Sequence, residues 1–166
     1  MAIIPVLRNS MFIKGQVFNT LGVPTEDMVE WGIELLTLGY DSPNLRILAG
    51  LTDLNDRWEV TDYVNKTLKD FNISELTGKD AVIAYTSVIL KEFLTRKISQ
   101  ERMLRQIEQL YLSWDYLKEI MDFYLLWNAK YDLSYGDVQY YWPDATRDNI
   151  NRIIKEQAEM WLKNYS

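Results

Sequence analysis

The chain has 166 residues, of which 48% are hydrophobic and 25% charged, with a formal net charge of −6. A chain of this length and composition fits one globular domain with a substantial core. It contains neither cysteine nor histidine, which excludes disulfides, thiolate nucleophiles and imidazole as a base or metal ligand. We therefore expect no metal site and no cofactor, and the acidic balance argues against nucleic acid as a partner.

The first residues of the chain do not have the pattern of a targeting segment. Residues 1–8 are apolar, but the run is short, lacks a basic region before it and is interrupted by Pro5. No stretch approaches the roughly 18 consecutive apolar residues of a membrane span. The sequence thus predicts no membrane association and a cytoplasmic location.

Apolar spacing in the first half of the chain predicts helices separated by turns. They are expected over residues 10–21, 25–38, 43–51 and 57–71. Thr25 is the expected N-cap of the second helix, and Gly39 is its expected stop. Ser42 should cap the third helix, because Pro43 after it suits a first helical position.

The second half continues the helical spacing. Residues 81–94 are apolar nearly all round, which predicts a largely buried central helix near residues 79–97. Ser99 should cap the next helix. Further helices are expected over residues 115–130 and from Asp144 or Thr146 to near the end. The sequence shows no convincing strand pair, so it predicts an all-α, single-domain bundle of about seven or eight helices over residues 1–166.

Several groups of charged residues could form binding sites, but each has a simpler structural interpretation. The acids at four-residue steps in 26–34 suit a solvated helix face. The segment 53–56 resembles the start of a calcium loop but lacks its glycine and closing ligand, so a capping turn is expected. The acids in 115–122 have a lysine among them, and nothing marks a cleft. Residues 91–105 carry five bases against two acids, which could meet an anion or complement helix dipoles.

Aromatic residues are the densest feature of the sequence. The chain has six Trp, eleven Tyr and five Phe, and eleven of these aromatic residues lie in residues 111–142. Those up to Tyr131 lie on predicted helices and are expected in the core. Those in 135–142 lie in a predicted loop, which either forms a contact surface or folds down to cap the bundle. The candidate partner-binding residues are Tyr135, Asp137, Tyr140, Tyr141 and Trp142, and no catalytic residue is identified.

One segment supports a family resemblance. Residues 31–51, WGIELLTLGYDSPNLRILAGL, resemble a helix–turn–helix start in small, uncharacterised bacterial α-helical proteins. Some of these are similar to immunity proteins of polymorphic toxin systems. The residues that carry the resemblance, Trp31, Gly39, Ser42 and Leu48, are structural in type. The resemblance therefore implies the all-α fold and maps no functional residue onto this chain.

Three functions remain as hypotheses. A non-enzymatic interaction protein, such as a toxin-neutralising immunity protein, would use the acidic charge and the aromatic loop against a partner with a basic surface. A structural or self-associating scaffold would use residues 135–142 as a homo-oligomer interface. A carboxylate-based hydrolase needs two acids that converge in a pocket. The sequence shows no such pair, so it favours a non-enzymatic role without deciding whether the protein is an enzyme.

Overall fold

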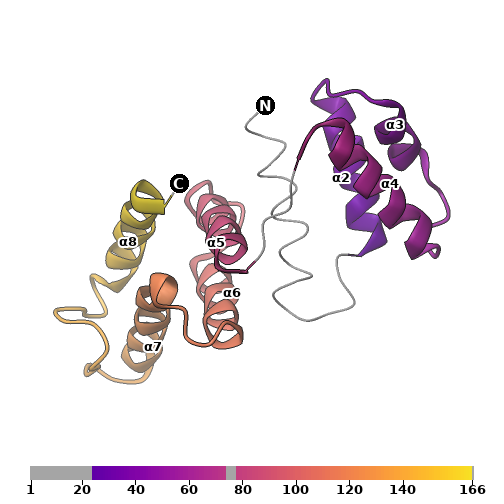
Figure 1. The fold of residues 1–166 in the computed structure, drawn as a ribbon. Helices are drawn as coiled ribbons and strands as arrows, with labels where there is room; N and C mark the ends of the chain where they lie inside the picture. Colours follow the sequence, from indigo (N-terminus) through magenta and orange to yellow (C-terminus); the bar gives the residue numbers. More distant parts are fainter. Residues whose placement is uncertain (1–23, 74–77, 166) are drawn as a thin grey trace. The chain divides into compact units, whose positions relative to one another are not determined.

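A computed structural model describes residues 24–73 and 78–165 (Figure 1). Within these ranges it contains seven α-helices, one 3-10 helix and no strand, which confirms the all-α prediction. The elements are α2 (Thr25–Thr37), α3 (Pro43–Gly50), α4 (Arg57–Asp70), α5 (Gly78–Leu94), α6 (Gln100–Ser113), η1 (Lys118–Ile120), α7 (Met121–Tyr135) and α8 (Ile150–Tyr165). The helix predicted over residues 10–21 lies outside the described residues.

Contacts along the chain divide it into two compact units, with the boundary between Ala81 and Val82. The expectation that residues 1–166 form a single domain stays a prediction.

The first unit contains a three-helix arrangement in which α2, α3 and α4 pack against one another. Its core consists of apolar side chains at helical spacing, with Leu35, Leu45, Leu48, Val60 and Val64 fully buried. Where α2 meets α3, the helices approach closely. A Cβ atom on Gly32 would lie 3.1 Å from Leu48 Cγ and 3.4 Å from the backbone nitrogen of Ala49.

The turn between α2 and α3 follows the sequence prediction. Gly39 has a φ of +89°, and the backbone N–H of Tyr40 donates to the carbonyl of Leu35 over 3.0 Å. Such a left-handed residue after the last turn ends a helix and satisfies its free carbonyls. Ser42 Oγ then accepts from the Leu45 N–H over 3.1 Å, with Pro43 at the first position of α3. The predicted stop and the predicted cap are both confirmed.

The predicted N-cap at Thr25 is wrong. Pro24 occupies the cap position of α2 and Thr25 is the first helical residue. The buried Thr25 hydroxyl instead donates to the carbonyl of Leu54 over 2.7 Å, in the turn before α4. The Thr25 hydroxyl, which the sequence predicts to cap α2, therefore forms a long-range hydrogen bond instead.

The turn before α4 is the capping turn that the sequence predicts. Asp56 Oδ1 accepts from the Glu59 N–H over 3.0 Å and caps α4. Asp53 Oδ1 accepts from the Asn55 N–H over 3.0 Å within the turn. Among the residues with described positions, no group of acids is arranged to hold a metal ion.

The prediction of a largely buried helix near residues 79–97 is confirmed in α5. Its buried residues are Ala81, Val82, Tyr85, Thr86, Ser87, Ile89 and Leu90. The helix ends at Leu94, and Arg96 follows with a φ of +62°. The Lys97 N–H then donates to the carbonyl of Glu92 over 2.8 Å and closes the last turn.

The helix predicted to begin at Asp115 begins later. Asp115 and Tyr116 have positive φ values of 49° and 59°, so helical backbone cannot pass through them. The N–H of Tyr116 donates to the carbonyl of Tyr111 over 3.0 Å, and the two rings pack edge to face at 5.4 Å. The chain therefore turns here, passes through η1 and enters α7 at Met121.

In the second unit α7 packs against α6 and α8, and two long-range hydrogen bonds join α8 to η1 and to the start of α7. Trp161 Nε1 donates to the carbonyl of Glu119 over 2.7 Å, and Gln157 Nε2 donates to Asp122 Oδ2 over 2.9 Å. The fully buried Phe123 meets the Trp161 ring edge to face. In the ranges that the structure describes, no helix is long and apolar enough to cross a membrane.

Candidate functional site

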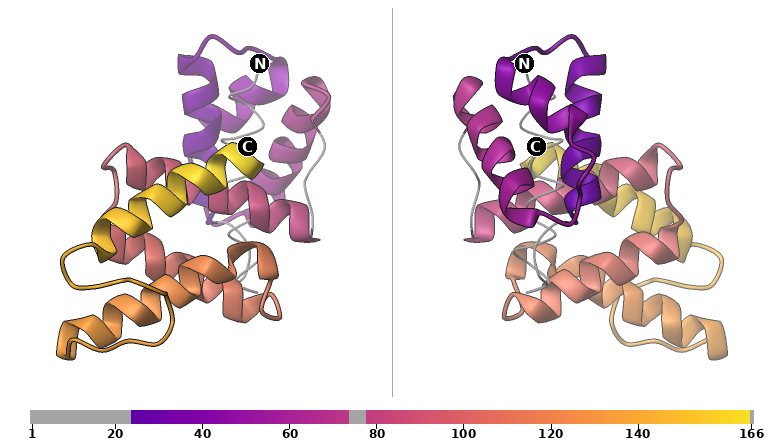
Figure 2. Two further views of the ribbon diagram at one scale, coloured as in Figure 1. Left: turned by 90° about the vertical axis from the view of Figure 1, so that its left-hand side faces the viewer. Right: turned by 90° about the vertical axis from the view of Figure 1, so that its right-hand side faces the viewer.

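The connection between α7 and α8, residues 136–149, contains most of the predicted contact residues (Figures 1 and 2). The prediction that Tyr135 lies in the loop is wrong, because Tyr135 is the last residue of α7. The Gly136 N–H still donates to the carbonyl of Asp132 over 3.0 Å, so helical bonding reaches one residue beyond Tyr135. At four-residue spacing the rings of Tyr131 and Tyr135 lie side by side, 5.1 Å apart.

Three of the four predicted aromatic contact residues are exposed. The exposed fraction is 77% for Tyr135, 91% for Tyr140 and 42% for Tyr141. Trp142 is half-buried, and Asp137 is exposed beside the loop's only base, Arg147. The alternative of a loop folded down as a cap thus describes Trp142 but not the tyrosines. A partner-binding role for these residues stays a prediction.

The side chain of Gln139 holds the loop in shape through four hydrogen bonds. Its Oε1 accepts from the N–H groups of Tyr141 and Trp142, both over 2.9 Å. Its Nε2 donates to the carbonyls of Trp142 over 2.6 Å and Ala145 over 3.2 Å. One amide thereby satisfies four backbone groups of an irregular segment. The backbone on either side of Tyr140 is fixed while its ring points outward.

Arg147 and Asn149 complete the internal bonding of the loop. Arg147 Nε donates to the carbonyl of Leu133 over 2.7 Å, and its Nη1 lies 3.3 Å from Asp137 Oδ1. Asn149 Nδ2 donates to the carbonyl of Asp144, and its Oδ1 accepts from the Thr146 N–H. Sequence reasoning missed Gln139 and both of these residues. The available signal was that each has a side chain with several hydrogen-bonding groups and lies within an irregular segment that must satisfy its own backbone.

The surface around the loop is acidic. Between Tyr131 and Asn149 the acids are Asp132, Asp137, Asp144 and Asp148, and the only base is Arg147. The side-chain hydrogen bond between Tyr131 and Tyr135 raises the pKa of the Tyr131 phenol above its ordinary value. The surface therefore combines exposed aromatic rings with several carboxylates.

Replacing Gln139 with alanine should loosen the loop while leaving the helices intact. The Tyr141 and Trp142 N–H groups lose their acceptor, and the net contribution of one such bond is about 0.5–1.5 kcal/mol. We expect their hydrogen exchange to accelerate by roughly two- to tenfold, as measured by NMR or mass spectrometry. In the same sample the α8 core amides, such as that of Ile154, should keep their rates. Unchanged exchange at residues 141 and 142 would show that Gln139 does not hold the loop.

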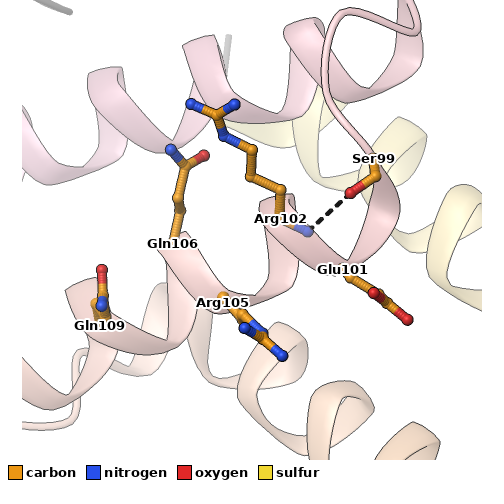
Figure 3. Close-up of a pocket in the computed structure, with 6 residues that line it drawn as sticks. All are labelled: Ser99, Glu101, Arg102, Arg105, Gln106 and Gln109. Atoms are coloured by element: carbon orange, nitrogen blue, oxygen red, sulfur yellow. Dashed lines mark hydrogen bonds between the residues drawn. The ribbon is translucent and has the colours of Figure 1, made fainter.

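The basic stretch weighed as an anion site does not converge on one point. A hollow of about 340 Å³ on α6 is lined by Ser99, Glu101, Arg102, Arg105, Gln106 and Gln109 (Figure 3). In that view the Arg102 and Gln106 side chains extend to one side of α6, and Arg105 extends to another. The Arg105 guanidinium lies 5.7 Å from the Trp127 ring centroid. Ser99 Oγ accepts from the Arg102 N–H and caps α6, as predicted.

A second hollow, of about 470 Å³, lies between the start of α7 and the end of α8. Its lining includes Glu119 and Asp122, but Asp122 already accepts from Gln157 and both residues are only half-buried. In the ranges 24–73 and 78–165 no aspartate or glutamate is buried. A carboxylate pair with pKa values pushed apart needs such burial, so the geometry gives the hydrolase hypothesis no support.

Fold and loop together define a class: an all-α protein that presents an acidic aromatic loop, held by internal hydrogen bonds, between α7 and α8. Comparison with protein families, curated proteins and solved structures finds no match. The assignment of a function thus rests on the geometry of this chain.

Proposed function

We propose that this chain is a non-enzymatic protein-interaction module that contacts its partner through the α7–α8 loop. The observation that carries the proposal is the combination of exposed Tyr140 and Tyr141 rings with the Gln139 bonds that fix their backbone. A preordered surface loses little conformational entropy on binding. Tyrosine also provides a large contact area with few rotatable bonds, and it is common among residues that dominate binding energy.

The charge around the loop favours a partner with a basic surface. The four acids and one base between residues 131 and 149 would attract such a partner and orient it. A toxin-neutralising immunity protein is the specific form of this proposal. Its support is the resemblance at residues 31–51 together with the acidic aromatic loop.

The proposal is tested by binding to the product of the adjacent gene. We expect co-purification of the two proteins, with a dissociation constant below the micromolar range. The double substitution Tyr140→Ala and Tyr141→Ala should weaken binding at least tenfold, because each removes an exposed ring. The control is Met160→Ala, a side chain on α8 that is 53% exposed and outside the loop. Equal loss in both variants, or no binding by the wild type, would contradict the proposal.

Self-association is the second candidate, because the same exposed rings could meet those of another copy. Light scattering of the wild type and of Tyr140→Ala separates the two functions. A dimer that dissociates in the variant supports self-association, and a monomer in both excludes it at the concentrations measured.

A further inference from the structure

The most exposed tryptophan lies in the first unit, far along the sequence from the α7–α8 loop. Trp58 is the second residue of α4, and 89% of its surface is accessible. By contrast, Trp31 in the same unit is buried in the core. An exposed indole offers a large apolar contact area, and tryptophan is among the residues enriched in the hot spots of binding surfaces.

The Thr25–Leu54 hydrogen bond brings acidic residues from two segments to this end of α4. It places the first turn of α2 beside the 53–56 turn and the first turn of α4. These segments contribute five carboxylates: Glu26, Asp27, Asp53, Asp56 and Glu59. None of the five forms an ion pair with a residue that the structure describes.

Charge is unevenly distributed between the two ranges that the structure describes. Residues 24–73 contain ten acids and four bases, whereas residues 78–165 contain thirteen acids and twelve bases. Two of the four bases in the first range, Arg46 and Lys66, are paired with Asp41 and Asp62. The net negative charge is therefore concentrated in residues 24–73, where Trp58 lies.

Helix dipoles account for part of this pattern. Acids in a first helical turn are stabilised by the positive end of the dipole, and Asp56 also caps α4. The helix dipole stabilises charged groups, so it does not explain the exposed and uncharged indole of Trp58. The feature to be explained is thus an exposed indole in the same first turn of α4 as Arg57 and Glu59, with the carboxylates of Glu26, Asp27, Asp53 and Asp56 in the segments beside that turn.

We propose that Trp58 and the carboxylates around it form a docking surface for an arginine-rich segment of a partner protein. A guanidinium can stack on the indole face and also donate paired hydrogen bonds to a carboxylate. This surface contains no residue of the α7–α8 loop, and the proposal does not depend on the function proposed for that loop.

The test uses the full chain and a fluorescently labelled peptide of alternating arginine and glycine, followed by anisotropy at about physiological ionic strength. Trp58→Ala should raise the dissociation constant about fivefold, because a cation–π contact of this kind contributes about 1 kcal/mol. Tyr140→Ala should leave it unchanged. The proposal would be overturned if wild type and Trp58→Ala bound the peptide equally well, or if Tyr140→Ala lost as much affinity as Trp58→Ala. The experiment with the product of the adjacent gene tests the α7–α8 loop alone.

A pair of charge variants separates docking from general attraction. Asp53→Asn with Glu59→Gln removes two charges beside Trp58, and Glu30→Gln with Glu34→Gln removes two from exposed positions further along α2. Both variants change the net charge equally. The first should weaken the peptide at least threefold more than the second, and equal weakening would show that only the overall charge matters. Circular dichroism of each variant checks that the helices are retained.

Discussion

Replacing Phe123 with alanine is expected to lower the free energy of unfolding by about 3–5 kcal/mol. The side chain is fully buried on α7 and meets the Trp161 ring edge to face at 6.5 Å. Its removal leaves a cavity under the indole that ties α8 to Glu119. Because a domain of this kind is typically stable by only about 5–15 kcal/mol, the loss is a large share of the total.

Urea titration followed by tryptophan fluorescence and by circular dichroism measures this effect. Phe123→Leu should cost much less, since most of the buried volume is kept. Met160→Ala, at a half-exposed position of α8, should change the free energy of unfolding by less than about 0.5 kcal/mol. If Phe123→Ala were as mild as Met160→Ala, the packing of α7 on α8 would not be the source of stability inferred here.

Gly32→Val should be the most damaging small substitution in the first unit, at a cost of about 1–3 kcal/mol. The new Cβ would lie 3.1 Å from Leu48 Cγ and 3.4 Å from a backbone nitrogen of α3, and backbone cannot rotate out of the way. Leu48 is itself fully buried, so it has no room to move. Valine would force α2 and α3 apart.

The matched control is Gly50→Ala at the end of α3. Its Cβ would meet nothing within 4 Å, so only helix propensity changes, and alanine is favoured over glycine by up to about 1 kcal/mol. Thermal unfolding of the two variants should therefore move in opposite directions. A stabilised Gly32→Val would mean that the α2–α3 approach is looser than the structure shows.

Features governed by local chemistry could be predicted from the sequence. The stop at Gly39 and the caps at Ser42 and Ser99 depend on residues within one helical turn, and all three were correct. The features that the sequence did not predict depend on contacts formed only in the folded chain. Thr25 bonds to a residue 29 positions away. Tyr116 takes a left-handed backbone while its ring packs on Tyr111.

The candidate site shows the same division. Composition indicated which aromatic residues were worth attention, and Tyr140 is indeed the most exposed of them. It could not indicate that Tyr135 belongs to α7, because the helix continues through a stretch whose spacing is not periodic. Nor could it assign Gln139 its role, since four bonds to one amide depend on the folded path of the loop.

The positive φ values at Arg96 and Tyr116 have a consequence for engineering the protein. A left-handed backbone costs an ordinary residue about 1–2 kcal/mol, and only glycine or, less well, asparagine and aspartate tolerate it. Both residues stand in the connections that flank α6, where the chain must reverse direction. Substitutions that make this protein more thermostable would thus be sought first in these two connections. Position 96 comes first, because glycine there removes strain without removing a packed ring.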